Sequence, residues 1–331
     1  MITKKQFATI HHAGFKSLLQ KAMEVGIDVY LYPNCANLTR FKYKGRVIYA
    51  NNNFPPLQSQ LGDFTLNKEV TKTILSECNI PVPRGISAIN ATQAINLIKK
   101  NKLSYPLILK PIDGTLSKGI TWNITSQQKL KDAVQYLENE RKKYTFLNRR
   151  KFIVEEMVCG EEYRVLVLEN KVISCVERLP ATIIGNATSS IEELIATQNK
   201  SRPTEHAIKL DDTVAEHIKK NGFTMQSILP KSHKLVLRDD VMLGNGGRII
   251  DCTKQINSSI KKQCIKAVKV LGLVYGGVDI ISEDITKNAN YSILEINSKP
   301  VYTINEKPLV EGPGVDVSLL LLQKMFPELK K

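Results

Sequence analysis

Three oxygen-bearing side chains near the C-terminus are the strongest sign of chemistry in the sequence. Asp279 lies in the segment GGVDIIS, and Glu295 and Asn297 lie in LEIN. Both segments are typical of strands, and alternate strand residues face one side of a sheet, so Glu295 and Asn297 project together. Asp279 joins them if the two strands are neighbours. Two carboxylates and an amide oxygen suit Mg²⁺ shared with phosphates, although a single acid at a sheet edge is usually only solvated.

A lysine followed by a glycine-bearing loop forms a second candidate site. Lys110 ends the apolar segment PLILKP, and the loop DGTLSKG follows with Gly114 and Gly119 on either side of small hydroxyl residues. The main-chain N–H groups of such a loop can bind phosphate oxygens. Many strand-end lysines and many tight loops have no such role, so the loop alone is weak support for a phosphate site.

The segment FIVEEMVCGEEYR combines a buried strand with an acidic turn. The strand ends in four consecutive residues, Glu155, Glu156, Met157 and Val158. A free backbone N–H and C=O at such a strand end match the hydrogen-bonding edge of adenine, and Glu162, after the break at Gly160, is placed to accept from ribose hydroxyls. The alternative is a plain hairpin with charged flanks.

The elements that must position these residues divide into three lobes of mixed helix and strand, residues 1–62, 63–148 and 149–331. In the first lobe, residues 12–25 carry apolar side chains at helical spacing and a strand IDVYLYP follows. The segment RFKYKGRVIYAN is typical of a hairpin that turns at Lys44-Gly45. We therefore expect an α+β protein with a small N-terminal α/β lobe.

The second and third lobes alternate helices with short strands. The second combines the helix NKEVTKTILSECN and a helix near residues 94–98 with the strands PLILKP and ITWNI, and ends in a helix over 126–143. The third has the strands KFIVEEMV, EYRVLVLE and KVISCVER, and Ser190 with Glu193 forms a capping box before a short helix. Helices over 259–271 and 317–325 follow.

The composition excludes several classes of protein. No run approaches the roughly 20 apolar residues of a membrane span, and the first residues show no apolar leader region. The six cysteines form no CxxC pair, and no HExxH, Walker A, GxSxG or GxGxxG motif is present. Scattered cysteines suit a reducing compartment, so we expect a cytoplasmic protein without membrane contact.

The net charge of +15 favours an anionic partner. The densest basic segment is ERKKYTFLNRRK, at residues 140–151. No aromatic platform or nucleic-acid reader motif accompanies it, so a solvated helix end and turn explains it better, and no nucleic-acid partner is expected. An RNA-binding α/β protein stays an alternative that depends on charge alone.

The order of these features along the chain resembles that of the ATP-grasp superfamily of carboxylate–amine ligases. The features are a lysine-bearing helix, the KP strand with its glycine loop, the EE strand end with a later glutamate, and the D…E-x-N pattern. The resemblance covers about residues 63–331. From Val176 onward the sequence is most similar to the glutathione-synthetase half of bifunctional bacterial glutathione enzymes and to the ligase part of cyanophycin synthetase. The matching segments are ERLPATIIGN, SIEELIATQNKSRP, VLRDDVMLGNGGRIIDCT, GGVDII and LEINSKP.

The resemblance implies an ATP-grasp fold, in which two α+β lobes clamp ATP. It implies two Mg²⁺ ions, with Mn²⁺ as a substitute, held by Asp279, Glu295 and Asn297. Phosphates would be bound by Lys68 and Lys110 and covered by a lid of residues 113–119, which includes Asp113, Gly114, Lys118 and Gly119. Adenine would meet the stretch Glu155, Glu156, Met157 and Val158, and ribose would meet Glu162. The residues implied for the reacting groups are Lys118, Arg178 and Arg238.

The chain also departs from the pattern of its relatives. Simpler ATP-grasp ligases carry an arginine two residues before the first metal aspartate, where this chain has Gly277, so the anion role would fall to Arg238 or Arg178. The run GNGG at residues 244–247 would lie near the acceptor, but Met242 replaces an asparagine of the glutathione-type pattern. The acceptor pocket is therefore expected to differ, and glutathione as product stays open.

Together these features predict an ADP-forming ligase that joins a small-molecule carboxylate donor to an amine acceptor through an acyl-phosphate. The alternative is a regulatory nucleotide-binding protein without catalysis, which would retain the lysines and the adenine strand but lose metal ligands. Because all three of Asp279, Glu295 and Asn297 are present, the ligase is favoured. A homodimer is compatible with the sequence, which does not identify the two substrates.

Overall fold

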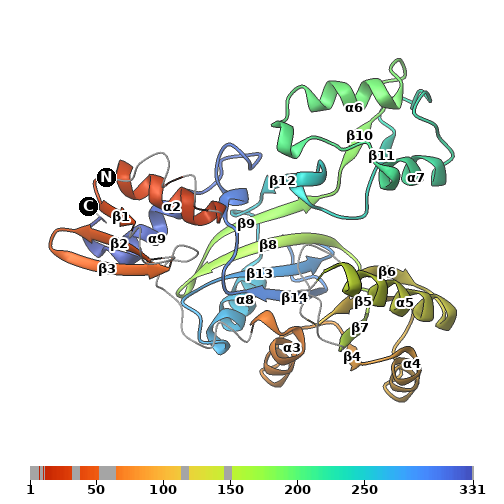
Figure 1. Ribbon diagram of the computed structural model, residues 1–331, viewed down its shortest axis with the longest axis horizontal. Helices are drawn as coiled ribbons and strands as arrows, with labels where there is room; N and C mark the ends of the chain where they lie inside the picture. The colour runs from red at the N-terminus through yellow and green to blue at the C-terminus, as the bar shows by residue number, and fades with distance from the viewer. Residues whose placement is uncertain are drawn as a thin grey trace.

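The computed structural model describes residues 7, 10, 12–31, 38–51, 65–112, 119–144 and 151–329. Within these ranges the strands form four sheets, and helices pack on them to give the α+β class that the sequence predicts (Figure 1). No helix in the described ranges is both long and apolar enough to cross a membrane.

The N-terminal part is one helix on a three-stranded antiparallel sheet. Helix α2 (Ala13–Glu24) precedes β1 (Asp28–Leu31), β2 (Leu38–Tyr43) and β3 (Arg46–Asn51), in the order β1-β2-β3. Lys44 and Gly45 have φ angles of 45° and 83°, as the tight hairpin turn predicted there requires. The helix α9 (Val317–Met325) shares this core, so the two ends of the chain lie together (Figure 1).

A second antiparallel sheet has the order β4-β7-β5-β6. Its strands are β4 (Gly85–Ala88), β5 (Leu107–Pro111), β6 (Thr121–Ile124) and β7 (Phe152–Glu156). Helices α4 (Ala91–Lys100) and α5 (Gln127–Lys143) bury their apolar faces against one side of it, with Leu107, Leu109 and Phe152 in the core. The opposite side, which carries Lys110 and Glu155, is left for the candidate site.

The largest sheet has the order β12-β9-β8-β13-β14. It consists of β8 (Glu161–Leu168), β9 (Lys171–Leu179), β12 (Arg248–Asp251), β13 (Tyr275–Ser282) and β14 (Tyr291–Asn297), all antiparallel to their neighbours. Helix α8 (Ser258–Val270) covers one face. Helix α3 (Lys68–Glu77) packs on this sheet through Leu75, and it lies between β14 and the strands β4 and β7 (Figure 1). The three-lobe division itself stays a prediction.

Between β9 and β12 the chain builds a separate small unit that the sequence patterns did not reveal. It contains β10 (Thr182–Ile184), α6 (Ile191–Asn199), α7 (Asp212–Lys220) and β11 (Lys234–Val236), with a hydrophobic core of its own. The capping box of Ser190 and Glu193 begins α6 as predicted. Short 3-10 turns are η3 (Thr204–His206), η4 (Leu243–Asn245), η5 (Thr303–Asn305) and η6 (Pro327–Leu329).

Gly160 joins the second sheet to the largest one, at the turn from β7 into β8. Its φ angle is 129°, and a Cβ atom there would clash with the carbonyl oxygen of Ser282. We expect Gly160→Ala to lower the free energy of unfolding by roughly 2–3 kcal/mol, measured by urea denaturation. Gly222→Ala is the control, because φ is 81° but nothing lies within 4 Å, and we expect a loss of about 1 kcal/mol. Equal losses would show that contact with Ser282 is unimportant.

Candidate nucleotide and metal site

Helix α3 carries two lysines toward two different sheets. Asn67 caps the helix by accepting from the N–H groups of Glu69 and Val70, which places Lys68 in the first turn and Lys72 one turn later. Lys68 Nζ lies 3.5 Å from Glu295 Oε2 on β14, and Lys72 Nζ forms an ion pair with Glu155 on β7. The helix therefore links the predicted metal residues to the predicted nucleotide strand.

The carboxylate of Glu155 is enclosed by two lysines. Lys110 Nζ lies 2.6 Å from Oε2 and Lys72 pairs with Oε1, while the Glu155 side chain is 1% exposed. Burial would raise the pKa of Glu155, but the charges of Lys110 and Lys72 hold it below its usual value. Gly85 gives this carboxylate room, since a Cβ there would lie 2.6 Å from Glu155 Cγ. The side chain thus faces Lys72 and Lys110, of which Lys110 is predicted to bind phosphate.

The main chain after Glu155 has the features expected of an adenine-binding strand end. The N–H of Glu156 donates to the carbonyl of Arg84 at 2.9 Å, and that of Met157 donates to the carbonyl of Pro106 at 3.0 Å. In the described ranges the N–H of Val158 has no hydrogen-bond partner. Of the four predicted residues, Val158 therefore has the free donor, and the side chain of Glu156 accepts from Ser104 N–H and Arg84 instead.

The three predicted metal ligands lie on neighbouring strands. Asp279 on β13 pairs in register with Glu295 on β14, and a bulge follows directly after Asp279. Asn297 Nδ2 donates to Asp279 Oδ2 at 3.2 Å. Among the described residues no three His, Cys, Asp or Glu side chains form a metal cluster, so the candidate set is these two carboxylates with one amide. Their hard oxygen atoms fit Mg²⁺.

Arg164 is a member of the site that the sequence analysis missed. It lies on β8 opposite Asp279, donates from Nη2 to Asp279 Oδ2 at 2.9 Å, and also contacts Oδ1 through Nε. Gly277 leaves space for it, because a Cβ there would lie 3.3 Å from Arg164 Cδ. An arginine from the adjacent strand thus reaches the aspartate. The sequence did contain a signal for it: Arg164 lies two residues after the predicted Glu162, and residues two apart on a strand face the same side of the sheet.

Arg178 and Glu162 form the outer pair on the same face of the sheet. They are partners in the β8–β9 register, and Arg178 Nη1 lies 2.5 Å from Glu162 Oε1. Burial raises the pKa of Glu162 against the attraction of Arg178, and the nearby charge of Asp279 adds to the rise. Both predicted residues therefore lie beside the metal candidates, with the acid engaged by the arginine.

Comparison with known proteins identifies the fold that carries these residues. Residues 103–178 match the family of ATP-grasp domains. A solved bifunctional glutathione synthetase from Pasteurella multocida is similar in structure over 98% of this chain and 44% of its own, with a TM-score of 0.71 and 23% identity. The chain has the ATP-grasp fold. The ATP-grasp fold predicted from the sequence is confirmed.

Curated relatives match this chain over most of its length. Cyanophycin synthetase of Geminocystis herdmanii is 33% identical over 276 residues, which are 80% of this chain and 31% of that protein. The glutathione biosynthesis bifunctional protein GshAB of Streptococcus mutans is 30% identical over 275 residues, 80% of this chain and 35% of that protein. The chain thus spans about a third of the length of these relatives.

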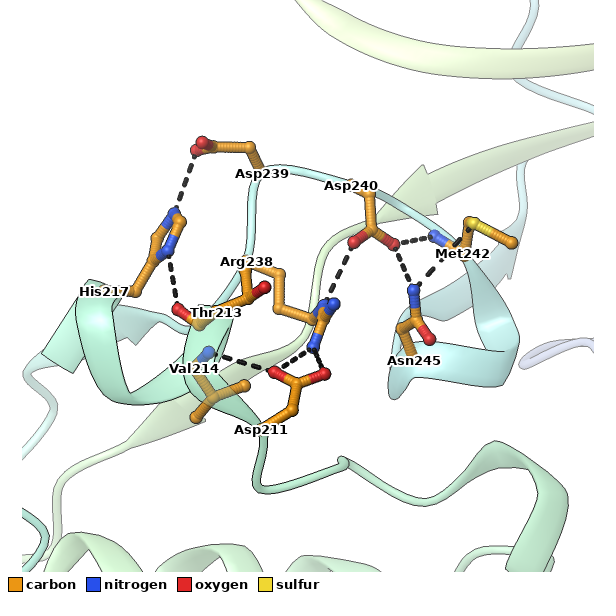
Figure 2. A network of polar contacts seen from close by, with 9 residues as sticks. All are labelled: Asp211, Thr213, Val214, His217, Arg238, Asp239, Asp240, Met242 and Asn245. Carbon is orange, nitrogen blue, oxygen red and sulfur yellow. Dashed lines mark hydrogen bonds and ion pairs between the residues drawn. The ribbon is translucent and has the colours of Figure 1, made fainter. Parts of the chain in front are cut away.

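Arg238 lies in the small unit between β9 and β12. Its Nη1 donates to both oxygens of Asp211 at 2.8 Å, and its Nε donates to Asp240 at 3.0 Å (Figure 2). Asp211 also caps α7, and Asp240 accepts from Met242 N–H and Asn245 Nδ2. The arginine that the resemblance assigned to a substrate anion therefore fastens the GNGG loop to a helix start.

The predicted lid lies largely outside the described residues. Residues 113–118, with Asp113, Gly114 and Lys118, belong to this part, and Gly119 is described with a φ angle of 71°. In the basic segment, residues 145–150 likewise lie outside the described residues. Lys143 forms an ion pair with Glu140, and Lys151 forms one with Glu69. The assignments of individual site residues stay predictions.

The clamp formed by Arg238 generates a test of its role. Arg238→Met leaves Asp211 and Asp240 without their partner, but Asp211 is 44% exposed, so we expect a loss of roughly 1–2 kcal/mol in unfolding free energy by urea denaturation. Arg248→Met, which breaks the exposed pair with Glu311, is the control and should cost less than about 1 kcal/mol. Unchanged stability of Arg238→Met would return this arginine to the list of substrate-binding candidates.

Proposed function

We propose that the protein is an ATP-dependent carboxylate–amine ligase that forms an amide bond and releases ADP and phosphate. The observation that carries the proposal is the meeting of lysines, arginines and carboxylates from two sheets around α3. Lys68 and Lys110 are suited to phosphate, while Asp279 and Glu295 are suited to a divalent cation. A cation-rich and acid-rich site of this kind matches a nucleotide with its metal.

The relatives support a ligase through their names, a synthetase and a bifunctional protein of glutathione biosynthesis. Because the chain spans about a third of their length, their substrates are not transferred to it. The proposal is therefore limited to the class of reaction, with a small-molecule carboxylate donor and an amine acceptor. The main-chain N–H of Val158 would receive adenine, and the loop 113–119 would cover the phosphates.

The residues divide the work of the reaction. Lys68 and Lys110 would hold the ATP phosphates. Asp279, Glu295 and Asn297 would hold Mg²⁺, as two ions in the full site, with Mn²⁺ as a substitute. When bound, Mg²⁺ neutralises charge on the terminal phosphates. A donor carboxylate oxygen attacks the γ-phosphorus and ADP leaves, which forms an acyl-phosphate. Arg164 and Arg178 stabilise its charge while the amine attacks the acyl carbon, loses a proton and displaces phosphate.

Oxygen labelling tests the chemical route. The donor carboxylate is labelled with heavy oxygen, and a panel of amino acids and dipeptides is offered in pairs, with phosphate release as the readout. We expect one labelled oxygen in inorganic phosphate and unlabelled ADP, because the terminal phosphate is the group that the site holds. Label in AMP would overturn the acyl-phosphate route, and nucleotide binding without any product would favour the regulatory alternative.

Glu295→Gln tests the metal assignment. Glutamine keeps the shape but removes the charge, so we expect turnover to fall by about 10²-fold or more, while the melting temperature stays close to that of the wild type. The control is Glu283→Gln, at an exposed acid in the turn after β13. A folded Glu295→Gln variant with normal turnover would remove the metal assignment.

A further inference from the structure

Lys72 is a buried charge at the candidate site to which neither the sequence patterns nor the proposed reaction gives a role. It follows Lys68 by one helical turn, so both lysines lie on the same face of α3. Its side chain is 12% exposed, and its ion-pair partner is the Glu155 carboxylate on β7. Burying an ammonium group costs several kcal/mol of desolvation free energy, which a paired charge must offset.

The geometry around Glu155 suggests what Lys72 does. One oxygen of the carboxylate pairs with Lys72 and the other with Lys110, so two ammonium groups share one negative charge. Without Lys72, the full charge of Glu155 would be available to Lys110 alone. Since Lys110 is one of the two lysines proposed to bind phosphate, that pairing would compete directly with ATP.

We propose that Lys72 is a positioning residue for nucleotide binding: it neutralises Glu155 and thereby leaves the positive charge of Lys110 available to the ATP phosphates. The proposal rests on the proposed function, because it assigns Lys72 a role toward the same nucleotide. It requires Glu155 to stay in place, and Gly85 provides for this by leaving the space that the Glu155 side chain fills.

The surroundings of Lys72 make its charge sensitive to pH. Lys110 from β5, Glu155 from β7 and Glu295 from β14 all act on it. Glu69 and Glu77 on α3 and Arg84 before β4 border the adjoining cavity. Burial lowers the pKa of Lys72 to about 8, the charge of Lys110 adds to this, and Glu155 opposes it. The ammonium is therefore present at neutral pH and lost as the pH rises through 8.

Binding of Mg-ATP, measured by calorimetry without the second substrate, tests the role of Lys72. We expect Lys72→Met to weaken binding by about tenfold or more, since Lys110 then pairs fully with Glu155. Lys72→Arg should bind nearly as the wild type does, because the adjoining cavity of about 540 Å³ has room for a guanidinium. The double variant Lys72→Met/Glu155→Gln should regain affinity, since Lys110 loses its competitor.

The pH profile gives a second readout that needs no unstable variant. Wild-type affinity for Mg-ATP should fall between about pH 7 and 9 as Lys72 loses its proton, whereas Lys72→Arg should keep its affinity because arginine stays charged. Equal affinity of wild type and folded Lys72→Met, or equal weakness of the single and double variants, would overturn the proposal. Absence of Mg-ATP binding by the wild type would instead overturn the proposed function on which it rests.

Discussion

Ion pairing between elements that are distant in sequence is the constraint on which the candidate site depends. A buried charge without a partner costs several kcal/mol, so none of the strands that carry these residues can be placed alone. Helix α3 meets this requirement on two sides at once, because Lys68 pairs with β14 and Lys72 with β7. The largest sheet repeats the pattern with Arg164 on Asp279 and Arg178 on Glu162.

This pairing has a consequence for ligand binding. Every phosphate oxygen that approaches Lys110 competes with Glu155, and a cation that approaches Asp279 competes with Arg164. On the proposed function, a nucleotide that binds with its metal would exchange these partners: its phosphates would pair with the lysines, and the metal would pair with the carboxylates. The affinity for such a nucleotide would depend on how strongly each residue is bound to its partner in the protein before the exchange. Because Glu155 is shared between Lys72 and Lys110, it holds Lys110 less strongly than an unshared carboxylate would.

The sequence predicted the parts of the molecule that local patterns determine. The structure contains the predicted hairpin turn at Lys44-Gly45, the predicted capping box of α6 and the predicted helix α9. The predicted strands β13 and β14 are neighbours and bring Asp279 beside Glu295. The strands β4, β10, β11 and β12 were not predicted, because three or four residues contain too little periodicity to read. The fold class could thus be predicted, but the small unit between β9 and β12 could not.

The site residues were harder to predict because their partners are set by register between distant strands. Arg164 meets Asp279 only through the pairing of β8 with β13, 115 residues apart in sequence. Lys72 was missed for the same reason, because its ion-pair partner Glu155 lies on another element. For Arg238, the resemblance gave a role toward substrate, while Asp211, 27 residues earlier, engages the guanidinium.

The small unit between β9 and β12 separates two tasks that the proposed ligase must perform. It has its own core, and the Arg238 clamp fixes the loop that carries the GNGG run without using any residue of the ion-paired site. Met242, where the chain departs from the glutathione-type pattern, lies in that loop together with Asn245, and both hydrogen-bond to Asp240. Changes there can alter the surface offered to an amine while the phosphate and metal residues keep their partners. If the proposed function holds, a new acceptor would therefore require no change in the residues proposed to activate the carboxylate.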